Sequence, residues 1–470
     1  MVRPDTIVAV GTPPGPSALA VIRLSGPAAF SIVLSLCPEL SETPEPRKVV
    51  LTRASDPGTE ESLDQVLMTL FPAPESYTGE DMAEISSHGG WLSPALILEA
   101  CLRAGARQAE EGEFTRRAFL NGKMDLLQVE AVLDLIEARS RALHGTAIHQ
   151  LERGLSERLG NLRTGIIQLE ALLVHHLDFP EEDDPPVPTA EIMGRAETLE
   201  EAMTSLLQTA PEGELLREGA VTVLAGLPNS GKSSLFNALL GEERAIVTEV
   251  PGTTRDALEA VVSLGGYPFR MVDTAGLRET HEQVEKMGVE VARRYLNGAD
   301  VVLFCVEADR ALSEEEVGFL DELGATPVVL VRTKVDLYGE DQIHSQTGFL
   351  EGQEPGWPHL PEGVGDVVVL SVRTGEGLDR LRETLPAMVF GGLVGTTWDI
   401  PVLTRRRHAD GIRLAKTELR AFRDALGQGL PAEVAATHLR PAETALEELL
   451  GIIPREEILD RLFSDFCIGK

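Results

Sequence analysis

The sequence has few cysteines, no long apolar run and no targeting signal. Its four cysteines are scattered and form no Cys-X-X-Cys pair: Cys37, Cys101, Cys305 and Cys467. This excludes a disulfide scaffold and a zinc site of the usual spacing. No stretch of eighteen apolar residues is present, and the first residues lack the zones of a secretory signal. Cys467 lies fourth from the end without a preceding polybasic segment, which argues against prenylation. We therefore expect a soluble, cytoplasmic protein that does not enter a membrane.

Positive charge is also scarce. The chain carries 42 Lys and Arg against 75 Asp and Glu, a formal net charge of −33. Such a balance repels nucleic acid at long range, because phosphate binding depends on clustered Lys and Arg. If RNA is a substrate, we expect a local patch or a partner protein to supply the positive field.

The length and the apolar pattern predict several domains. A chain of 470 residues exceeds one ordinary core, and a hydrophobic fraction of 43% suffices for two or three. Residues 1–120 mix strand-like runs with Pro and Gly turns, which indicates an α+β domain. Residues 121–217 and 388–470 have helical spacing, and residues 218–387 alternate β-branched strands with helices. We expect a multidomain fold, in which an α/β domain with a parallel sheet is inserted into an α-helical domain made of two parts.

The expected elements can be given as residue ranges. The inserted domain should have strands at 221–225, 269–272, 301–306, 328–331 and 367–370. The helical parts should have long amphipathic helices within 125–177, and further helices at 190–208, 405–426 and 432–450. Prolines and like charges predict a loop at 181–186.

A phosphate-binding motif follows the first strand of the inserted domain. Residues 226–233 read GLPNSGKS, which fits GxxxxGK[ST] between a strand and a helical run. In such a loop backbone N–H groups wrap the phosphates at a helix N-terminus. Lys232 would reach the β- and γ-phosphates, and the Ser233 hydroxyl would bind Mg²⁺. The remaining nucleotide-binding residues expected in this segment are Asn229, Ser230, Gly231 and Ser234.

Two further motifs follow in the order that a GTPase requires. Residues 252–256 read GTTRD and offer Thr254, a switch threonine that completes the Mg²⁺ shell when γ-phosphate is present. Residues 273–276 read DTAG at the end of a strand, so Asp273 is the expected Asp of the second metal motif and Gly276 an expected nucleotide-binding residue.

The base-recognition motif predicts specificity for guanine. Residues 333–336 read TKVD, and Asp336 is placed to accept from the guanine N1–H and exocyclic amine, with Lys334 beside it. The common form of this motif begins with Asn, so we expect Thr333 to weaken the contact between the base motif and the phosphate loop. Ser371, Val372 and Arg373 follow the last strand and correspond to a backbone loop near the guanine carbonyl.

Two usual catalytic groups are missing. Leu277 follows the DTAG motif, where small hydrolases of the Ras type have a water-orienting Gln. Glu282 and Glu285, just beyond, are the candidates to replace it, although an acidic helix there could be merely solvated. No arginine finger is evident, but Asn229 offers a carbonyl oxygen near the β- and γ-phosphates. A monovalent cation held there would neutralise the developing charge.

Taken together, the motifs resemble the family of tRNA-modification GTPases called MnmE or TrmE over essentially the whole chain. The resemblance rests on DTI at 5–7, TPPG at 12–15, RLSG at 23–26, SYTGED at 76–81, HGG at 88–90, GEFTRRAFLNGK at 112–123, the GTPase motifs and FCIGK at 466–470. It implies an N-terminal domain that binds 5-formyltetrahydrofolate or a related reduced folate and forms a homodimer. Folate contacts would be Arg23, Glu80, Lys123 and Lys470.

The same resemblance implies a potassium-dependent GTPase. The K⁺ site would comprise Asn229, Thr248, Val250 and Thr253, with Thr248 also near the nucleotide. Mg²⁺ would be held by Ser233 and Thr254 with Asp273 behind them, and Glu285 would orient the attacking water. Lys232 and Glu285 are thus the expected catalytic residues, together with Cys467, whose thiolate could attack a pyrimidine ring; an ordinary accessible thiol is the alternative.

The resemblance also implies partners. A flavin-dependent MnmG protein would form a heterotetramer with the homodimer and help to install an aminomethyl-type group at carbon 5 of the wobble uridine of certain tRNAs. The competing hypothesis is a ribosome-assembly GTPase that checks RNA without modifying it. Such proteins usually carry a second G domain or a basic RNA-binding module, and this sequence has one phosphate loop and no KH-type GxxG platform. A GTP-driven self-assembling protein would need membrane-facing helices, which the sequence lacks.

Overall fold

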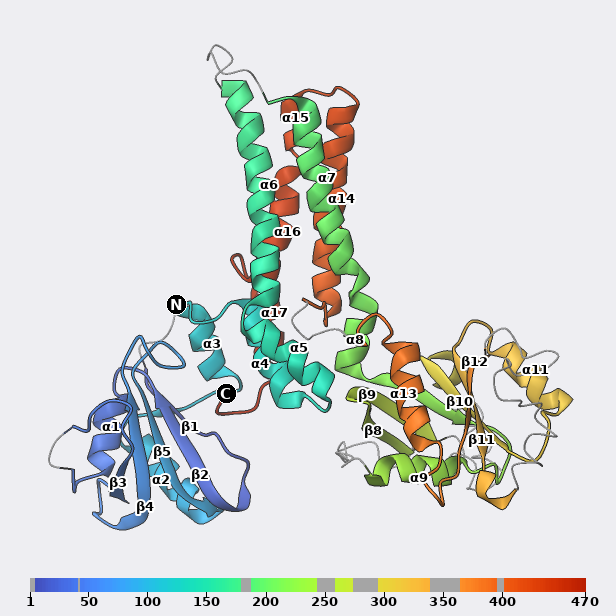
Figure 1. The fold of residues 1–470 in the computed structure, drawn as a ribbon. Helices are drawn as coiled ribbons and strands as arrows, with labels where there is room; N and C mark the ends of the chain where they lie inside the picture. The colour runs from blue at the N-terminus through green and yellow to red at the C-terminus, as the bar shows by residue number, and fades with distance from the viewer. Residues whose placement is uncertain are drawn as a thin grey trace, which may run out of the picture. The chain divides into compact units, whose positions relative to one another are not determined.

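The computed structural model describes residues 5–40, 43–178, 187–242, 258–273, 295–338, 364–394 and 401–470. The chain forms two compact units. Unit 1 comprises Met1–Leu133, Leu151–Gln168 and Leu439–Lys470, and unit 2 comprises Asp134–Gln150 and Leu169–His438. Figure 1 shows the elements of both. Within the described residues, no helix has the length and apolar character needed to cross a membrane.

Unit 1 contains a six-stranded sheet with strand order β3-β4-β5-β2-β1-β6. Neighbouring strands are antiparallel except β1 and β6, which are parallel. The strands are β1 (Ile7–Val10), β2 (Gly15–Ser25), β3 (Val50–Ser55), β4 (Ser62–Phe71), β5 (Met82–Gly90) and β6 (Arg107–Gln108). Because side chains alternate between the faces of a strand, one face buries Val8, Ile22, Leu24 and Ile85 against α1 (Ala29–Leu36) and α2 (Leu92–Arg103).

The other face of this sheet carries a second, smaller core and several charged side chains. Ile7, Ala9 and Met82 pack there with Phe114 of α3 (Glu113–Leu120). Arg23, one position away from Ile22 and Leu24 on β2, points to this face by the same alternation. The C-terminal residues lie here as well, because the Phe114 N–H donates to the Lys470 carbonyl (3.1 Å) and Glu111 forms a β-bridge with Ile468.

The helices of unit 1 pack in their own cluster. Leu126 and Val129 of α4 (Leu126–Glu137) pack against Leu462 and Phe463 of α17 (Glu456–Ser464). Arg163, on α6 (Gly154–Asp178), donates to Glu443 (2.9 Å) and Glu447 (2.7 Å) of α16 (Leu439–Leu450). Each carboxylate is 5% exposed, so this ion-pair network joins segments that are far apart in the sequence.

The helices of unit 2 include a long pair. α14 (Arg406–Gly427) lies along α7 (Thr189–Gln208), and Arg423 forms an ion pair with Glu200 at 3.2 Å. The shorter helices are α5 (Arg141–Leu151), α8 (Ala210–Glu218) and α15 (Ala432–Ala436). The helical pattern predicted for 432–450 corresponds to two helices: α15 ends at Ala436 and α16 begins at Leu439, so that Pro441 falls in the first turn of α16, where a missing N–H is tolerated.

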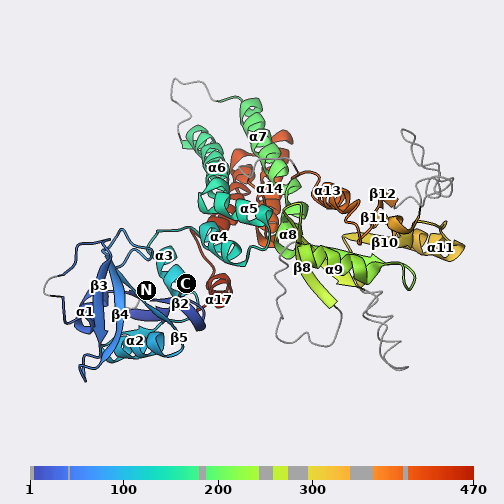
Figure 2. The same cartoon turned by 60° about the horizontal axis from the view of Figure 1, so that its bottom comes forward.

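The second sheet of the chain, in unit 2, has the order β12-β11-β10-β7-β9-β8. All pairs are parallel except the β8–β9 hairpin. Its elements are β7 (Ala220–Ala225), α9 (Lys232–Glu242), β8 (Leu258–Leu264), β9 (Tyr267–Asp273), β10 (Val301–Glu307), α11 (Glu314–Glu322), β11 (Val328–Thr333), the 3₁₀ turn η1 (Val335–Leu337), β12 (Val364–Val369) and α13 (Leu378–Val389). α9 and α13 pack on one face of the sheet, where they share the core with Phe269 and Leu303. α11 packs on the other face through Leu320, which belongs to the same core cluster as Phe304. Figure 2 shows α11 next to β10 and β11.

The predicted fold class is therefore confirmed: an α+β domain, helices and an α/β domain of the doubly wound type. β7, β10 and β11 are buried along their whole length or nearly so, as expected for parallel strands covered on both faces. β8 was not predicted. Its sequence signal is the two-residue turn Gly265-Gly266, with φ of 56° and 88°, which closes the hairpin to β9 in the manner that adjacent glycines favour.

Candidate functional site

The predicted phosphate loop connects β7 to the start of α9. Gly226 has φ 133°, and a Cβ there would lie 2.3 Å from the Cys305 carbonyl oxygen, so no larger residue fits. Asn229 also has positive φ, 63°, and its side chain lies at the surface. Lys232 is the first residue of α9, and its Nζ donates to the carbonyl oxygens of Gly226 (3.1 Å) and Leu227 (2.8 Å). The loop therefore wraps the N-terminus of a helix, where backbone N–H groups favour an anion.

Two of the three predicted Mg²⁺ residues meet beside this loop. The Ser233 hydroxyl donates to Oδ2 of Asp273 at 2.8 Å, and Asp273 is 1% exposed at the end of β9. Both groups present oxygen atoms, which are the ligands that Mg²⁺ prefers. The parallel pairing of β7 and β9 causes this meeting, because it places the ends of both strands at the same edge of the sheet.

Thr333 links the base motif to the phosphate loop. Its hydroxyl donates to the Ser230 carbonyl at 2.8 Å and lies 3.3 Å from the Val306 carbonyl. The side chain is buried, and a Cβ on Gly231 would come within 3.4 Å of it. Thr333 thus makes a direct hydrogen bond between the base motif and the phosphate loop. This is the contact that we expected a threonine at this position to weaken.

The base-recognition residues converge at the same edge of the sheet. Oδ1 of Asp336 accepts from the Ser371 hydroxyl, and Oδ2 accepts from Nε of Arg373 at 2.7 Å. The Ser371 hydroxyl and then the Arg373 guanidinium hold the pKa of Asp336 below its usual range, against the opposing effect of burial. Lys334, with φ 61°, forms an ion pair with Glu307 at the end of β10. The pairing of Glu307 with Lys334 was not predicted. Glu307 ends β10 and Lys334 follows β11, and the sequence alone does not show that these two strand ends lie side by side.

Several predicted residues lie outside the described part of the chain. These are Thr248, Val250, Thr253, Thr254, Gly276 and Glu285, together with the alternative Glu282. The described residues therefore place the phosphate loop, Asp273 and the base motif, and the switch residues stay predictions.

The predicted folate residues all lie in unit 1, where they form two groups. Arg23 donates to Glu84 (2.9 Å) and to the Gly469 carbonyl (3.1 Å), and its guanidinium lies 5.9 Å from the centre of the Phe114 ring. Lys470 belongs to the same group, because burial and then the charge of Arg23 lower its pKa, while Glu84 opposes them. Within the described part of the chain, the buried Arg23 Nε has no hydrogen-bond partner.

The second group surrounds Glu80. Its Oε2 accepts from the Ser25 hydroxyl (2.7 Å) and from Arg117 (3.0 Å). Lys123 lies beside this loop. If residue 79 carried a Cβ atom in place of the glycine hydrogen, that atom would lie 3.2 Å from the Lys123 side chain. Ser25 and Arg23 are two residues apart on β2 and therefore share a face of the sheet, which connects the two groups. Arg117 and Glu84, which contact Glu80 and Arg23, were not among the predicted residues, although Arg117 lies within the quoted 112–123 motif.

The thiol of Cys467 differs from the other three. Cys467 is exposed, whereas Cys37, Cys101 and Cys305 are buried. Burial raises the pKa of Cys37 to about 11 and the pKa values of Cys101 and Cys305 to about 12. A thiol must ionise to act as a nucleophile, so only Cys467 has the accessibility that the predicted role requires.

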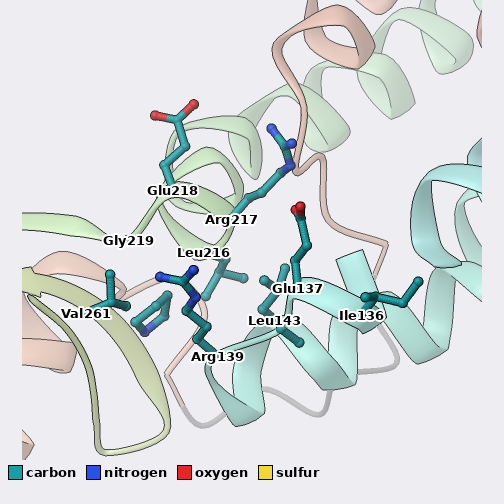
Figure 3. A pocket seen from close by; sticks show the side chains of 11 residues that line it. Ile136, Glu137, Arg139, Leu143, Leu216, Arg217, Glu218, Gly219 and Val261 are labelled. Atoms are coloured by element: carbon teal, nitrogen blue, oxygen red, sulfur yellow. The ribbon is translucent and has the colours of Figure 1, made fainter. Parts of the chain in front are cut away.

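A cavity of about 460 Å³ lies elsewhere in unit 2, between the α4–α5 connection, the end of α8 and the β8–β9 hairpin. Figure 3 shows Glu137 and Arg217 on one side of it and Arg139 near Val261. Arg217 also lies 3.3 Å from the buried Asp134 carboxylate. None of the residues that line this cavity belongs to the phosphate loop or the base motif, so it is separate from the nucleotide site.

Comparisons with known proteins agree with this organisation. A family model described as the MnmE helical domain matches residues 126–467, and one described as the GTP-binding protein TrmE N-terminus matches residues 6–123. The tRNA modification GTPase MnmE of Moorella thermoacetica is 40% identical over 471 residues and that of Neisseria gonorrhoeae 40% over 465, each alignment covering 99% of both chains. Among solved structures, the G domain of the T. maritima FeoB iron transporter is 30% identical in sequence to this chain. The alignment covers 36% of this chain and 96% of that chain, and its TM-score is 0.25.

Proposed function

The chain belongs to the MnmE family and is a GTP hydrolase of tRNA modification, and from this premise we propose how its residues serve that reaction. GTP binds with its phosphates at the loop before α9 and its base at Asp336. The observation that carries this assignment is the hydrogen bond of Thr333 to Ser230, because it joins the base motif and the phosphate loop into one site.

For the metal ions we propose the following division. Ser233 and Thr254 would hold Mg²⁺, with Asp273 behind them, where its carboxylate accepts from the Ser233 hydroxyl at 2.8 Å. Asn229 holds K⁺ with Thr248, Val250 and Thr253, and its exposed position in the loop supports this role. The cations supply positive charge to the phosphates, as an arginine finger does elsewhere.

The protein's own groups complete the hydrolysis step. Lys232 starts α9 and leaves its two carbonyl partners to contact the β- and γ-phosphate oxygens, which stabilises the charge that develops on them. Glu285 orients the attacking water and accepts its proton, in place of the missing glutamine.

We propose that unit 1 binds a reduced folate, the one-carbon donor. The orphaned Arg23 Nε and the cation of Lys470 suit a glutamate carboxylate, and the carboxylate of Glu80 suits the amide edge of a pterin. Lys123 lies beside Gly79, the residue before Glu80, and adds a positive charge. The folate supplies a one-carbon unit, and this chain's residues bind and orient it.

The partners are part of the same proposal. Unit 1 forms the homodimer, which is supported by exposed apolar side chains: Leu19, Leu51, Trp91 and Leu92 are each more than half exposed. An MnmG-type flavoprotein joins the homodimer in a heterotetramer and carries most of the tRNA contact, since this chain has a net charge of −33. The product is an aminomethyl-type group at carbon 5 of the wobble uridine, and Cys467 is the accessible thiol for attack on the ring.

The test of the GTPase mechanism is the steady-state hydrolysis rate in potassium and in sodium buffer at matched ionic strength. We expect strong stimulation by potassium in the wild type, its loss in Glu285→Ala, and its retention in Glu279→Ala, a control in the same acidic segment. Equal rates in both salts would overturn the potassium mechanism. A Glu285→Ala variant as active as the wild type would remove Glu285 from the site.

The folate assignment has a separate test. We expect Arg23→Ala and Glu80→Ala to weaken binding of 5-formyltetrahydrofolate in equilibrium dialysis. Arg47→Ala, which changes an arginine whose side chain is 49% exposed in the same unit, should bind like the wild type. Unchanged binding by both site variants would move the folate site elsewhere.

A further inference from the structure

The carboxylate of Asp336, which we assign to base recognition, accepts hydrogen bonds from two side chains of the protein itself. Ser371 donates to one oxygen of Asp336, and Nε of Arg373 donates to the other at 2.7 Å. The side chain of Asp336 is only 9% exposed, whereas that of Arg373 is 72% exposed. Asp336 therefore has one open edge, and Arg373 covers it from the solvent side.

Arg373 presents the same donor pattern as the base that we assign to this site. Atoms N1, C2 and N2 of guanine form a guanidine-like edge with parallel N–H donors, and this edge binds a carboxylate through two hydrogen bonds. The arginine side chain ends in a guanidinium whose N–H groups bind carboxylates in the same forked geometry. Arg373 and guanine are thus chemically similar ligands for a single carboxylate edge.

The loop that carries Arg373 is fixed, whereas the side chain can leave. The N–H groups of Arg373 (3.2 Å) and Thr374 (3.3 Å) donate to the buried Ser371 hydroxyl. The Ser371 N–H donates to the Glu376 carbonyl, and the Gly375 N–H donates to the Ser371 carbonyl, both at 2.9 Å. Displacing Arg373 from Asp336 therefore breaks one ion pair, of which only the arginine is exposed, and leaves the backbone of the loop in place.

We propose that Arg373 sets the nucleotide affinity of this GTPase by competing with guanine for Asp336. The inference rests on the proposed role of Asp336 in base recognition. Guanine displaces Arg373 as it binds, and Arg373 returns to the carboxylate as the nucleotide leaves. The empty site consequently never carries an unpaired carboxylate, and nucleotide release is easier than from a site without this arginine.

The test is the dissociation constant of GDP, measured by titrating the full-length protein with N-methylanthraniloyl-GDP. An ion pair whose arginine is largely solvated is weak, so removing the competitor in Arg373→Ala should tighten binding by about two- to five-fold. Arg380→Ala removes another exposed arginine, paired with Asp366 across 3.5 Å, and should leave affinity unchanged. The difference in GDP affinity between the wild type and Arg373→Ala should become smaller as salt is added, because salt screens the attraction between Arg373 and Asp336.

Arg373→Lys is a second variant that keeps the charge without the fork. It should bind GDP with an affinity between those of the wild type and Arg373→Ala, because an ammonium pairs with a carboxylate as a point charge. If Arg373→Ala binds GDP as the wild type does, the competition does not exist. If it binds more weakly, Arg373 contacts the bound nucleotide, and the inference is also overturned.

Asp336→Asn separates this inference from the assignment beneath it. The substitution replaces one acceptor oxygen with a donor, so preference should pass from GDP to xanthosine diphosphate, which has a carbonyl at C2. If no such exchange occurs, Asp336 does not read the base and the proposed base site itself fails. If the exchange occurs but Arg373→Ala does not tighten GDP binding, only the competition is disproved.

Discussion

The hydroxyl of Thr333 should be worth a measurable part of the nucleotide affinity. It is the donor to the Ser230 carbonyl within the phosphate loop, and the side chain is 2% exposed. Thr333→Val keeps the shape of the side chain and removes this donor, so the buried carbonyl loses its partner. A neutral hydrogen bond contributes about 1 kcal/mol, which corresponds to a factor of about five in binding if the loop must hold its shape to bind phosphate.

The assay is again titration with N-methylanthraniloyl-GDP, combined with urea unfolding. Thr222→Val is the matched control, because its hydroxyl is also buried in this sheet but donates to the Ala220 carbonyl, away from the loop. We expect both variants to lose a similar amount of stability, and only Thr333→Val to lose affinity. Thr333→Asn, which supplies an amide donor, should bind GDP within about three-fold of the wild type. Unchanged affinity in Thr333→Val, or an equal loss in Thr222→Val, would refute the reasoning.

Three further outcomes follow from burial and charge. Ellman's reagent should label one thiol rapidly in the native protein and none in Cys467→Ser, because burial raises the pKa values of the other three; a second fast thiol would contradict this. Phe390→Ala should lower the free energy of unfolding by about 3–5 kcal/mol in urea melts, since it removes the ring stacked 4.9 Å from Tyr267; a loss below about 1 kcal/mol would show that the core refills. Burial tends to raise the pKa of Glu113, but hydrogen bonds, first from Arg107, outweigh this and lower it. Its stabilisation is therefore complete above the ordinary glutamate pKa of about 4.3 and is lost as pH falls through the lower native value. Glu113→Gln should cost about 2 kcal/mol at pH 7 and progressively less below pH about 4, while Glu99→Gln, at an exposed pair, should cost little at either pH.

The parts of the fold that follow from local pattern were predictable. The buried strands of the second sheet and helix α7 were predicted from β-branched runs and helical spacing, and GLPNSGKS was placed correctly between a strand and a helix. The base motif was predicted because its residues are adjacent in the sequence. Each of these features depends on residues within one short segment.

What the sequence did not predict depends on distant contacts. The pairing of Lys334 with Glu307, of Glu80 with Arg117 and of Arg23 with Glu84 arises only when strands and helices have been placed side by side. The hydrogen bond of Thr333 to the Ser230 carbonyl was not predicted for the same reason, since its partner lies in another loop. β8 was missed although the Gly265-Gly266 turn that precedes β9 was a usable signal.

The composition of unit 1 bears on the order in which the chain can fold during synthesis. Its sheet comes from the first part of the chain, but Phe114 binds the carbonyl of Lys470, and α4 packs against α17. A growing chain emerges with its N-terminal part first. The contacts of unit 1 with Lys470 and α17 must therefore wait while the whole GTP-binding segment is translated. A chain interrupted before Leu439 would possess the phosphate loop and the base motif but no finished unit 1, so nucleotide binding in a cell extract does not by itself report a functional molecule.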